Sequence, residues 1–451
     1  MKLKAKQYAA LASMLFGMFF GAGNLIFPAL MGQMAGSKSP AATVGFLITG
    51  VGLPLLSIVA MGLSRSEGLM DMAGRVSRGY SMFFTCALYL TIGPLFAIPR
   101  TATVSFEVGI EAMAPELHPV WLVVFSVLFF AAVLFFSLRP SGILTWIGRI
   151  INPLFLVFLG VLLITALVSP MGAVSAVAPT GNYAERSFLT GFLEGYNTLD
   201  VLAGLAFGIV IIQVVRDLGV KEPKDIAANT VKAGVFGFIL MSLIYVAITL
   251  MGAQSRNILP LAKNGGIVLS QVAQHYFGPF GGILLAVTVI LACLKTAIGL
   301  VTSCAENFSK MFPRSMSYRG WAITFSVFSF IVANFGLNAI ITWSLPVLMF
   351  LYPLAITLIL LNLCGRWFGY AKPVFQWTTG FTVPAALLDL INALPAGVKE
   401  ALHLGGLIDL AEKVIPFYAQ GMGWILPAAT GCLIGLIIYR AGKGKKKVQA
   451  V

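Results

Sequence analysis

Long apolar stretches recur along almost the whole chain, and they limit its fold more than any other feature. Each stretch holds about 20 residues, the length that an α-helix needs to cross the hydrocarbon core of a bilayer. Because unpaired backbone groups are costly in hydrocarbon, such stretches form helices. We therefore predict an all-α integral membrane protein with twelve transmembrane helices. The predicted helices extend over residues 8–31, 41–63, 80–104, 119–138, 148–169, 195–215, 229–251, 279–304, 319–335, 339–363, 376–394 and 422–440.

The composition argues against the main soluble classes. Of the 451 residues, 59% are hydrophobic and 10% are charged, and the mean hydropathy is +0.93. Since a soluble domain carries about 25% charged residues, a disordered chain, a disulfide scaffold and a soluble enzyme are poor candidates. The five cysteines lie in apolar stretches without a C-x-x-C pair, and the three histidines lie in connecting segments. The sequence holds no zinc motif, and we expect neither enzymatic activity nor a cofactor.

The positive charges indicate how the helices are oriented. The net charge is +14, and most Lys and Arg residues fall in every second connecting segment. Because cytoplasmic loops are enriched in Lys and Arg, we expect a multi-pass protein of the cell membrane with both termini in the cytoplasm. The basic tail, 441–451, is expected to rest on the anionic inner leaflet, with recruitment of an anionic partner as the alternative. The charge excess therefore indicates orientation, and we expect no nucleic-acid partner.

Two of the predicted helices carry interruptions that a plain membrane anchor does not need. Residues 16–28 place three glycines, an asparagine and a proline in the middle of the first helix, and residues 196–208 do something similar in the sixth. Transporters use such discontinuous helices to present half-helix ends to a substrate and an ion. The alternative is packing, because each segment also holds a Gly-x-x-x-Gly pair.

The positions of the two interruptions favour transport over packing. They fall in the first members of two successive five-helix groups, 8–169 and 195–363. An odd number of helices makes the second group inverted relative to the first, as in inverted-repeat transporters with a binding site at the midplane. We expect one polytopic domain over 1–451, with two further helices over 376–440.

Four motifs resemble the signatures of the BrnQ-type branched-chain amino acid:cation symporters, within the amino acid–polyamine–organocation superfamily. The motifs are Phe20–Pro28, Gly93–Thr101, Thr198–Gly208 and Cys293–Glu306. The resemblance implies a leucine-transporter-type five-plus-five inverted repeat followed by two helices. It also implies uptake of leucine, isoleucine and valine, driven by a sodium or proton gradient. The expected partners are these substrates, the coupling cation and the lipid bilayer, with no obligate protein partner.

An amino acid needs donors for its carboxylate and acceptors for its ammonium group. Backbone N–H groups at the start of a half-helix suit the carboxylate, and free carbonyls beside the two breaks suit the ammonium group. Apolar residues of the sixth helix are candidates for the side-chain pocket, although each alone is more often a packing residue. The candidate substrate-binding residues are Phe19, Ala22, Gly23, Asn24, Val201, Leu202, Ala203, Gly204, Leu205 and Phe207.

The resemblance also implies a sodium site made of neutral oxygens, which suit a monovalent cation that must later leave. The expected ligands are carbonyls near Gly17, Phe20 and Gly299 and the hydroxyls of Thr302 and Ser303. The alternative is that these hydroxyls bond only to their own helix backbone.

Three charged residues within the predicted helices are candidates for coupling or gating. Lys295 lies mid-helix, where an ammonium group costs about 2.5–3.5 kcal/mol, and related proteins often have a hydroxyl residue there. In one hypothesis Lys295 pairs with Asp200. In a second hypothesis its ammonium group replaces the coupling cation. The alternative is that the side chain extends toward the membrane–water interface. Asp200 itself caps a half-helix or contacts the substrate ammonium group. Arg100 is expected near the outer end of the third helix, close to Glu107 or the headgroups, as an outer-gate charge.

Other functions remain open beside this one. A channel is disfavoured because no repeated filter motif or charged ring is present, and a membrane-embedded enzyme lacks a metal or nucleophile cluster. Among carriers, the alternative is a cation-coupled carrier of another neutral amino acid, in which Lys295 replaces or modulates sodium coupling.

Overall fold

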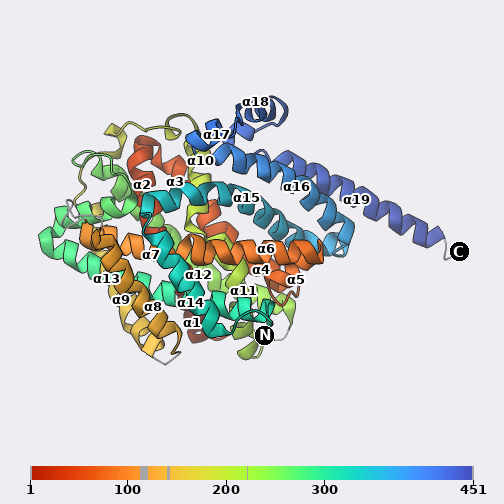
Figure 1. Ribbon diagram of the computed structural model, residues 1–451, viewed down its shortest axis with the longest axis horizontal. Coiled ribbons are helices and arrows are strands. Elements are labelled where there is room, and N and C mark those ends of the chain that lie inside the picture. Colours follow the sequence, from red (N-terminus) through yellow and green to blue (C-terminus); the bar gives the residue numbers. More distant parts are fainter. Residues whose placement is uncertain (1–2, 112–119, 140–142, 221, 449–451) are drawn as a thin grey trace.

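The computed structural model describes residues 3–111, 120–139, 143–220 and 222–448, and within these ranges the chain forms helices and no strands (Figure 1). The side chains of 143–155 are not described. The last three residues of the predicted basic tail, and the start of the predicted fourth helix, lie outside the described residues. Each of the twelve predicted ranges falls mostly on helix where it is described, and the exceptions include residues 20–22 in the first range, 199 in the sixth and 422–424 in the twelfth.

The first half of the chain contains both α-helices and π-helical segments, which are common near functional sites. Its elements are α1 (Ala5–Phe19), α2 (Gly23–Ala35), η1 (Gly36–Lys38), α3 (Ser39–Leu47), η2 (Ile48–Gly52), α4 (Leu53–Leu63), α5 (Leu69–Gly74), α6 (Arg78–Leu90), η3 (Thr91–Leu95), α7 (Ala97–Phe106), η4 (Glu107–Glu111), α8 (Val120–Ser137) and α9 (Ile143–Val168), of which η2, η3 and η4 are π-helical.

The second half begins with two short elements and continues with long helices. Its elements are η5 (Val174–Ala176), α10 (Tyr183–Glu194), η6 (Gly195–Thr198), α11 (Asp200–Asp217), α12 (Pro223–Ser255), α13 (Gly265–Met311), α14 (Tyr318–Ala333), α15 (Leu337–Cys364), η7 (Gly365–Phe368), α16 (Lys372–Ala393), α17 (Ala396–Ala401), α18 (Gly405–Val414), η8 (Tyr418–Gln420) and α19 (Ile425–Val448). Helices α16 and α19 extend together from one side of the bundle (Figure 1).

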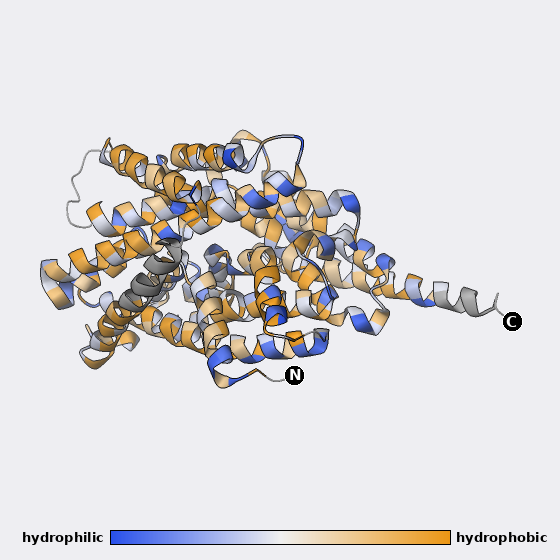
Figure 2. Ribbon diagram, turned by 90° about the horizontal axis from the view of Figure 1, so that it is seen from below, coloured by the Kyte–Doolittle hydropathy of each residue, from blue (hydrophilic) through white to orange (hydrophobic). Residues whose placement is uncertain are grey.

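Apolar residues cover most of the helices, and hydrophilic residues gather at helix ends and connections (Figure 2). Large apolar side chains are exposed on the outer helices, including Leu128 of α8 at 67% and Leu243 of α12 at 62%, as expected for a surface against lipid. By length and composition, seven helical stretches of the described residues can cross a membrane, or eight if the bent pair α10–α11 is one span. The count of twelve spans stays a prediction.

The first predicted helix is broken where its glycines indicate. Helix α1 ends at Phe19, Phe20 is extended with φ −76° and ψ 103°, and α2 begins at Gly23. The Asn24 side chain folds back over the gap and accepts a hydrogen bond from the Gly21 N–H at 2.8 Å. The N-terminus of α2 therefore opens in the interior of the bundle.

The sixth predicted helix is also broken, between η6 and α11. The chain bends by 45° between the two halves of this helix. At the break Leu199 has φ +65°, a left-handed conformation that costs a residue with a Cβ about 1–2 kcal/mol. Gly204, one turn further, is a packing residue, because a Cβ there would lie 2.1 Å from the Ser57 hydroxyl oxygen. The sixth helix is therefore broken at Leu199, and its Gly204 is at the same time a packing residue.

The third predicted helix is continuous but kinked at η3. Gly93 has non-helical angles (φ −103°, ψ −124°) and is followed by Pro94, which lacks an N–H donor. The donor missing at Pro94 would have served a carbonyl of the preceding turn. The Cys304 thiol of α13 donates to the Tyr89 carbonyl at 3.6 Å, and Ser329 of α14 donates to the Pro94 carbonyl at 3.5 Å. The kink sets the direction of α7, which carries Arg100.

Helices α2 and α12 touch backbone to backbone. A Cβ on Gly32 would lie 2.1 Å from the Thr249 carbonyl oxygen, and a Cβ on Gly252 would lie 2.2 Å from the Ala29 carbonyl oxygen. Such small-residue contacts allow the closest approach between membrane helices. The outer half of the broken first helix is therefore held against α12.

Candidate functional site

A cavity of about 80 Å³ lies where the two broken helices meet α7 and α13. Both breaks contribute backbone to its wall, and α7 and α11 contribute one charged side chain each. The residues that line it are Met18, Phe19, Gly21, Ala22, Gly23, Asn24, Ile92, Ala97, Arg100, Thr101, Thr198, Leu199, Asp200, Ala203, Phe207, Thr296 and Leu300.

The N-terminus of α2 faces this cavity through Ala22 and Gly23. The first N–H groups of a helix have no partner within the helix, and they carry the positive end of the helix dipole. Ala22 and Gly23 both line the cavity, while the preceding Gly21 N–H is already paired with Asn24. The start of α2 thus has the features that suit a carboxylate group.

A buried polar cluster joins the two breaks to α12. The Asn24 amide donates to the Asp200 carboxylate at 2.6 Å and also contacts the Tyr245 hydroxyl, which lies 3.4 Å from the same carboxylate oxygen. Asn24 and Asp200 are each 2% exposed, and the Asp200 N–H donates to the Thr198 hydroxyl at 3.3 Å. Because hydrogen bonds to a charged group in a low-dielectric interior are strong, this cluster holds the break residues in one arrangement.

Arg100 of α7 also lines the cavity. It is 4% exposed, and its guanidinium donates to the Asn197 carbonyl at 2.8 Å. The guanidinium carbon lies 5.1 Å from the centre of the Phe27 ring, a distance suited to a cation–π contact. Arg100 and Asp200 line the same cavity, so the site contains one buried guanidinium and one buried carboxyl group.

Arg100 lies farther from the end of its helix than the sequence predicts, and its role as an outer-gate charge stays a prediction. The third predicted helix was bounded at residue 104, whereas helical structure continues through η4 to Glu111. Because the helix is longer and kinked at η3, Arg100 lies deeper in the bundle than its distance from the predicted end indicates.

A smaller cavity, of about 30 Å³, lies beside the first and contains Lys295. The two cavities share Gly21, Ala22 and Thr296 as lining residues. Arg100 lines the cavity that Asp200 lines, and Lys295 lines the neighbouring one, so the pairing of Lys295 with Asp200 stays a prediction. The second hypothesis for Lys295, in which its ammonium group replaces a coupling cation, is also still a prediction.

The structure brings most of the predicted substrate-binding residues to the central cavity. Phe19, Ala22, Gly23, Asn24, Ala203 and Phe207 line it. Val201, Leu202, Gly204 and Leu205 are buried but are not among its lining residues. The reason is helical periodicity: α11 begins at Asp200, so positions 200, 203 and 207 share one face. The carbonyls predicted at 201–204 lie inside α11, and the carbonyl that faces Arg100 is that of Asn197.

The predicted sodium ligands lie on two elements of the site. Gly17 and Phe20 line the smaller cavity. Gly299 is exposed on α13, while Thr302 and Ser303 are half-buried one turn further on. Neither cavity of the described structure is lined by these three residues, so the sodium site stays a prediction.

Several residues of the site were not predicted from the sequence. Tyr245, Thr198, Leu199 and Thr296 belong to the polar cluster or to the cavity wall. Tyr245 carried a usable signal, because tyrosine is enriched at membrane interfaces and this one lies in the middle of an apolar stretch.

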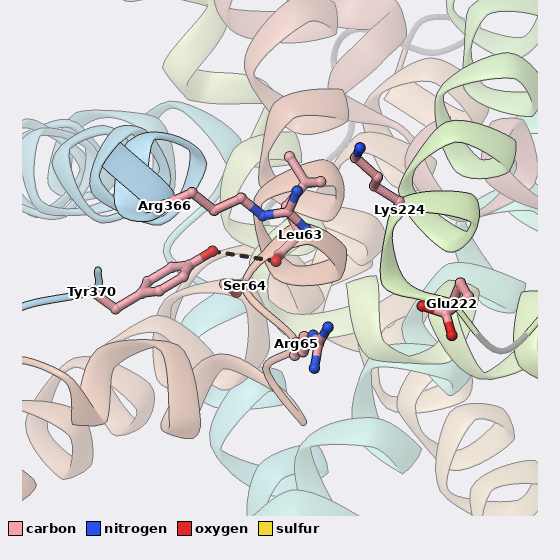
Figure 3. Close-up of a pocket in the computed structure, with 7 residues that line it drawn as sticks. All are labelled: Leu63, Ser64, Arg65, Glu222, Lys224, Arg366 and Tyr370. Carbon is pink, nitrogen blue, oxygen red and sulfur yellow. Dashed lines mark hydrogen bonds between the residues drawn. The ribbon is translucent and has the colours of Figure 1, made fainter. Parts of the chain in front are cut away.

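A larger cleft, of about 450 Å³, is lined by residues that follow α4, begin α12 and belong to η7 (Figure 3). Arg65, Lys224 and Arg366 extend into it from the end of α4, the start of α12 and η7, and Glu222 lies beside them. All four of these charged side chains are exposed. Two lining residues of the cleft are joined by a hydrogen bond, in which the Tyr370 hydroxyl donates to the Leu63 carbonyl at 3.3 Å. This cleft shares no residue with the central cavity.

Solved structures show which fold this arrangement belongs to. The inward-facing conformation of Mhp1 has a TM-score of 0.60 at 14% identity, covering 96% of this chain and 91% of that one. The crystal structure of MhsT in complex with L-phenylalanine has a TM-score of 0.56 at 16% identity, covering 86% and 98%. The likeness confirms the expected transporter fold; the inverted repeat, the helix count and the cytoplasmic termini stay predictions.

Sequence relatives show the family. The family model described as branched-chain amino acid transport protein matches residues 4–442. The branched-chain amino acid permease BrnQ of Lactobacillus delbrueckii subsp. lactis is 51% identical over 428 residues, covering 94% of this chain and 95% of that protein. The permease BrnQ of Bacillus subtilis (strain 168) is 40% identical, covering 97% and 98%. The chain therefore belongs to the branched-chain amino acid transport protein family and is a multi-pass protein of the cell membrane, not an enzyme.

Proposed function

We propose that the protein is a secondary active transporter that imports leucine, isoleucine and valine by symport with sodium ions or protons. The single observation that carries the proposal is the convergence of two broken helices on one cavity that holds donors, acceptors, a guanidinium and a carboxyl group. The relatives named as branched-chain amino acid permeases support the choice of substrate.

The site has complementary groups for each part of an α-amino acid. The substrate carboxylate lies at the N–H groups of Ala22 and Gly23, where the helix dipole favours an anion. The ammonium group lies at the Asn197 carbonyl and the Asp200 carboxylate. The aliphatic side chain extends along Ile92, Phe207 and Leu300, which form the apolar part of the wall; these groups are all on the cavity lining or bonded to it.

Transport requires the two halves of each broken helix to move relative to the rest. In this proposal the groups 8–169 and 195–363 are inverted repeats, followed by two further helices over 376–440. The first, second, sixth and seventh predicted helices rock against the third, fourth, eighth and ninth. Binding of substrate and cation at the breaks favours closure. No protein partner and no cofactor is required.

The coupling cation is the part of the proposal that most needs a test. A sodium ion binds near the carbonyls of Gly17, Phe20 and Gly299 and the hydroxyls of Thr302 and Ser303. In the alternative, the ammonium group of Lys295, in the neighbouring cavity, replaces or modulates that ion, and the substrate is another neutral amino acid.

Uptake by purified protein in proteoliposomes tests the proposal. We expect accumulation of labelled leucine when a sodium or proton gradient is imposed, and none without a gradient. Unlabelled isoleucine and valine compete, while lysine and glutamate do not. Failure of all three branched-chain amino acids to be taken up or to compete contradicts the proposed substrate. Uptake that equilibrates but never accumulates under either gradient contradicts symport. A Lys295→Thr variant with an unchanged ion requirement removes Lys295 from coupling.

A further inference from the structure

Arg100 is the buried cation of the central cavity, and its hydrogen bonding is incomplete. A guanidinium group has five N–H donors and no acceptor. Within the described residues, Arg100 makes one hydrogen bond, to the Asn197 carbonyl, while being 4% exposed. Buried donors without acceptors are costly, and the side chain lines the cavity. The remaining donors therefore face the space in which a ligand binds.

The guanidinium spans the two places that an amino acid occupies. One of its nitrogens, Nη1, lies 2.8 Å from the Asn197 carbonyl, at the break of the sixth helix. The other, Nη2, lies 3.4 Å from the position that a Cβ would take on Gly23, at the start of α2. One side of the guanidinium thus takes the acceptor suited to an ammonium group, and the other side adjoins the donors suited to a carboxylate.

The charges explain why this arrangement is poised for a zwitterion. A guanidinium beside the positive end of the α2 dipole is unfavourable, and the nearby Asp200 carboxyl group lines the same cavity. An arriving carboxylate relieves the unfavourable contact and accepts the spare donors in a forked geometry. An arriving ammonium group takes over the Asn197 carbonyl that Arg100 then leaves. The exchange leaves the net charge of the cavity unchanged.

We propose that Arg100 occupies the ammonium site of the empty carrier and moves its hydrogen bond from the Asn197 carbonyl to the substrate carboxylate when an α-amino acid binds. Arg100 is then the residue that selects for the carboxylate. This inference rests on the proposed function, because it assumes an α-amino acid in the central cavity. It predicts that recognition of the carboxylate and of the ammonium group are coupled through one side chain.

Binding of three related ligands to purified protein tests this role. The ligands are leucine, 3-methylbutylamine, which lacks the carboxylate, and 4-methylpentanoate, which lacks the ammonium group. We expect wild type to prefer leucine to the amine by about 100-fold or more, because the amine leaves Arg100 without its anion. In Arg100→Met, leucine binding weakens by about 30–100-fold and amine binding by less than about 3-fold, so the preference for leucine nearly disappears. In Arg100→Lys, the preference is intermediate because the charge remains and the fork is lost.

The controls separate this role from a structural one. Equal weakening of leucine and of the amine in Arg100→Met, in protein that remains monodisperse with its melting temperature within a few degrees of wild type, overturns the inference. If Arg100→Met does not fold, an unchanged leucine-to-amine preference in Arg100→Lys overturns it instead. If wild type binds a different neutral amino acid, the proposed substrate is wrong, and the same preference is measured with that amino acid and its decarboxylated amine.

Discussion

The central cavity and the cleft shown in Figure 3 contain similar groups in opposite surroundings. The cleft is the larger, about 450 Å³ against about 80 Å³, and has more charged side chains. In the cleft Arg65, Lys224 and Arg366 are exposed, whereas in the cavity Arg100 is 4% and Asp200 is 2% exposed.

The difference teaches that burial, and not volume, identifies the site. Charges near water interact through a high effective dielectric, and an exposed pair is worth about 0–1 kcal/mol. Buried charges at a membrane midplane are expensive and are retained where they bind something. Four substitutions sharpen or break this comparison, and they follow in order of expected effect.

The largest effect is expected for Asp200→Asn. The change keeps the shape of the side chain but removes the carboxyl group that accepts the Asn24 hydrogen bond and lines the same cavity as Arg100; leaving a buried cation without a counter-charge costs about 3–5 kcal/mol. We expect leucine uptake to fall at least about 100-fold, measured as the initial rate in proteoliposomes. Asp217→Asn, at the exposed end of the same helix, serves as control and keeps near wild-type uptake. Normal uptake in Asp200→Asn contradicts the assignment of the site.

A packing effect of a few kcal/mol is expected at Gly204. A Cβ there would lie 2.1 Å from the Ser57 hydroxyl oxygen, whereas a Cβ on Gly299 meets no atom within 4 Å. Overpacking costs about 1–3 kcal/mol, so Gly204→Ala lowers the melting temperature in detergent by several degrees. Gly299→Ala leaves it unchanged. A similar loss in both variants shows that the two glycines lie in equally crowded places.

A smaller effect is expected for Tyr245→Phe. The change removes only the hydroxyl that contacts Asn24 and lies 3.4 Å from Asp200. Since an ordinary hydrogen bond contributes about 0.5–1.5 kcal/mol, the leucine concentration for half-maximal uptake rises about 3- to 10-fold. The matched control is Tyr276→Phe, which removes an exposed hydroxyl that donates to the Ser169 carbonyl. If the leucine concentration for half-maximal uptake is unchanged in Tyr245→Phe, the polar cluster does not contribute to leucine binding.

The smallest effect is expected in the cleft. Arg366→Gln removes an exposed charge from its wall, and surface charges contribute little. We expect uptake within about 2-fold of wild type. A loss as large as that of Asp200→Asn breaks the comparison and makes the cleft a functional site.

The sequence predicts the breaks well because their cause is local. The glycines and Asn24 of the first helix, and the segment around Leu199 in the sixth, interrupt the helices where the pattern indicates. Which side chains reach the cavity is less local. Leu202 and Leu205 point away from it because α11 begins at Asp200, and that register is set by the break.

Contacts between distant segments are the hardest part to predict. Tyr245 reaches Asn24 across 221 residues of sequence, and nothing near either residue specifies that pairing. Arg100 is placed by the kink at Gly93 and by the full length of its helix. Composition alone indicated a charge within the membrane, but only packing determines which partner it meets.

The backbone contact between α2 and α12 connects the candidate site to a long, unbroken helix. Helix α12 is unbroken over 33 residues, so at about 1.5 Å per residue it is a rod about 50 Å long. Its end near Gly252 holds the outer half-helix of the site, while its other end begins beside the cleft that Lys224 lines. A tilt of only about 5° displaces the far end of such a rod by about 4 Å. If the proposed substrate binds at the start of α2 and tilts α12, the largest displacement is therefore expected at the end of α12 beside the cleft.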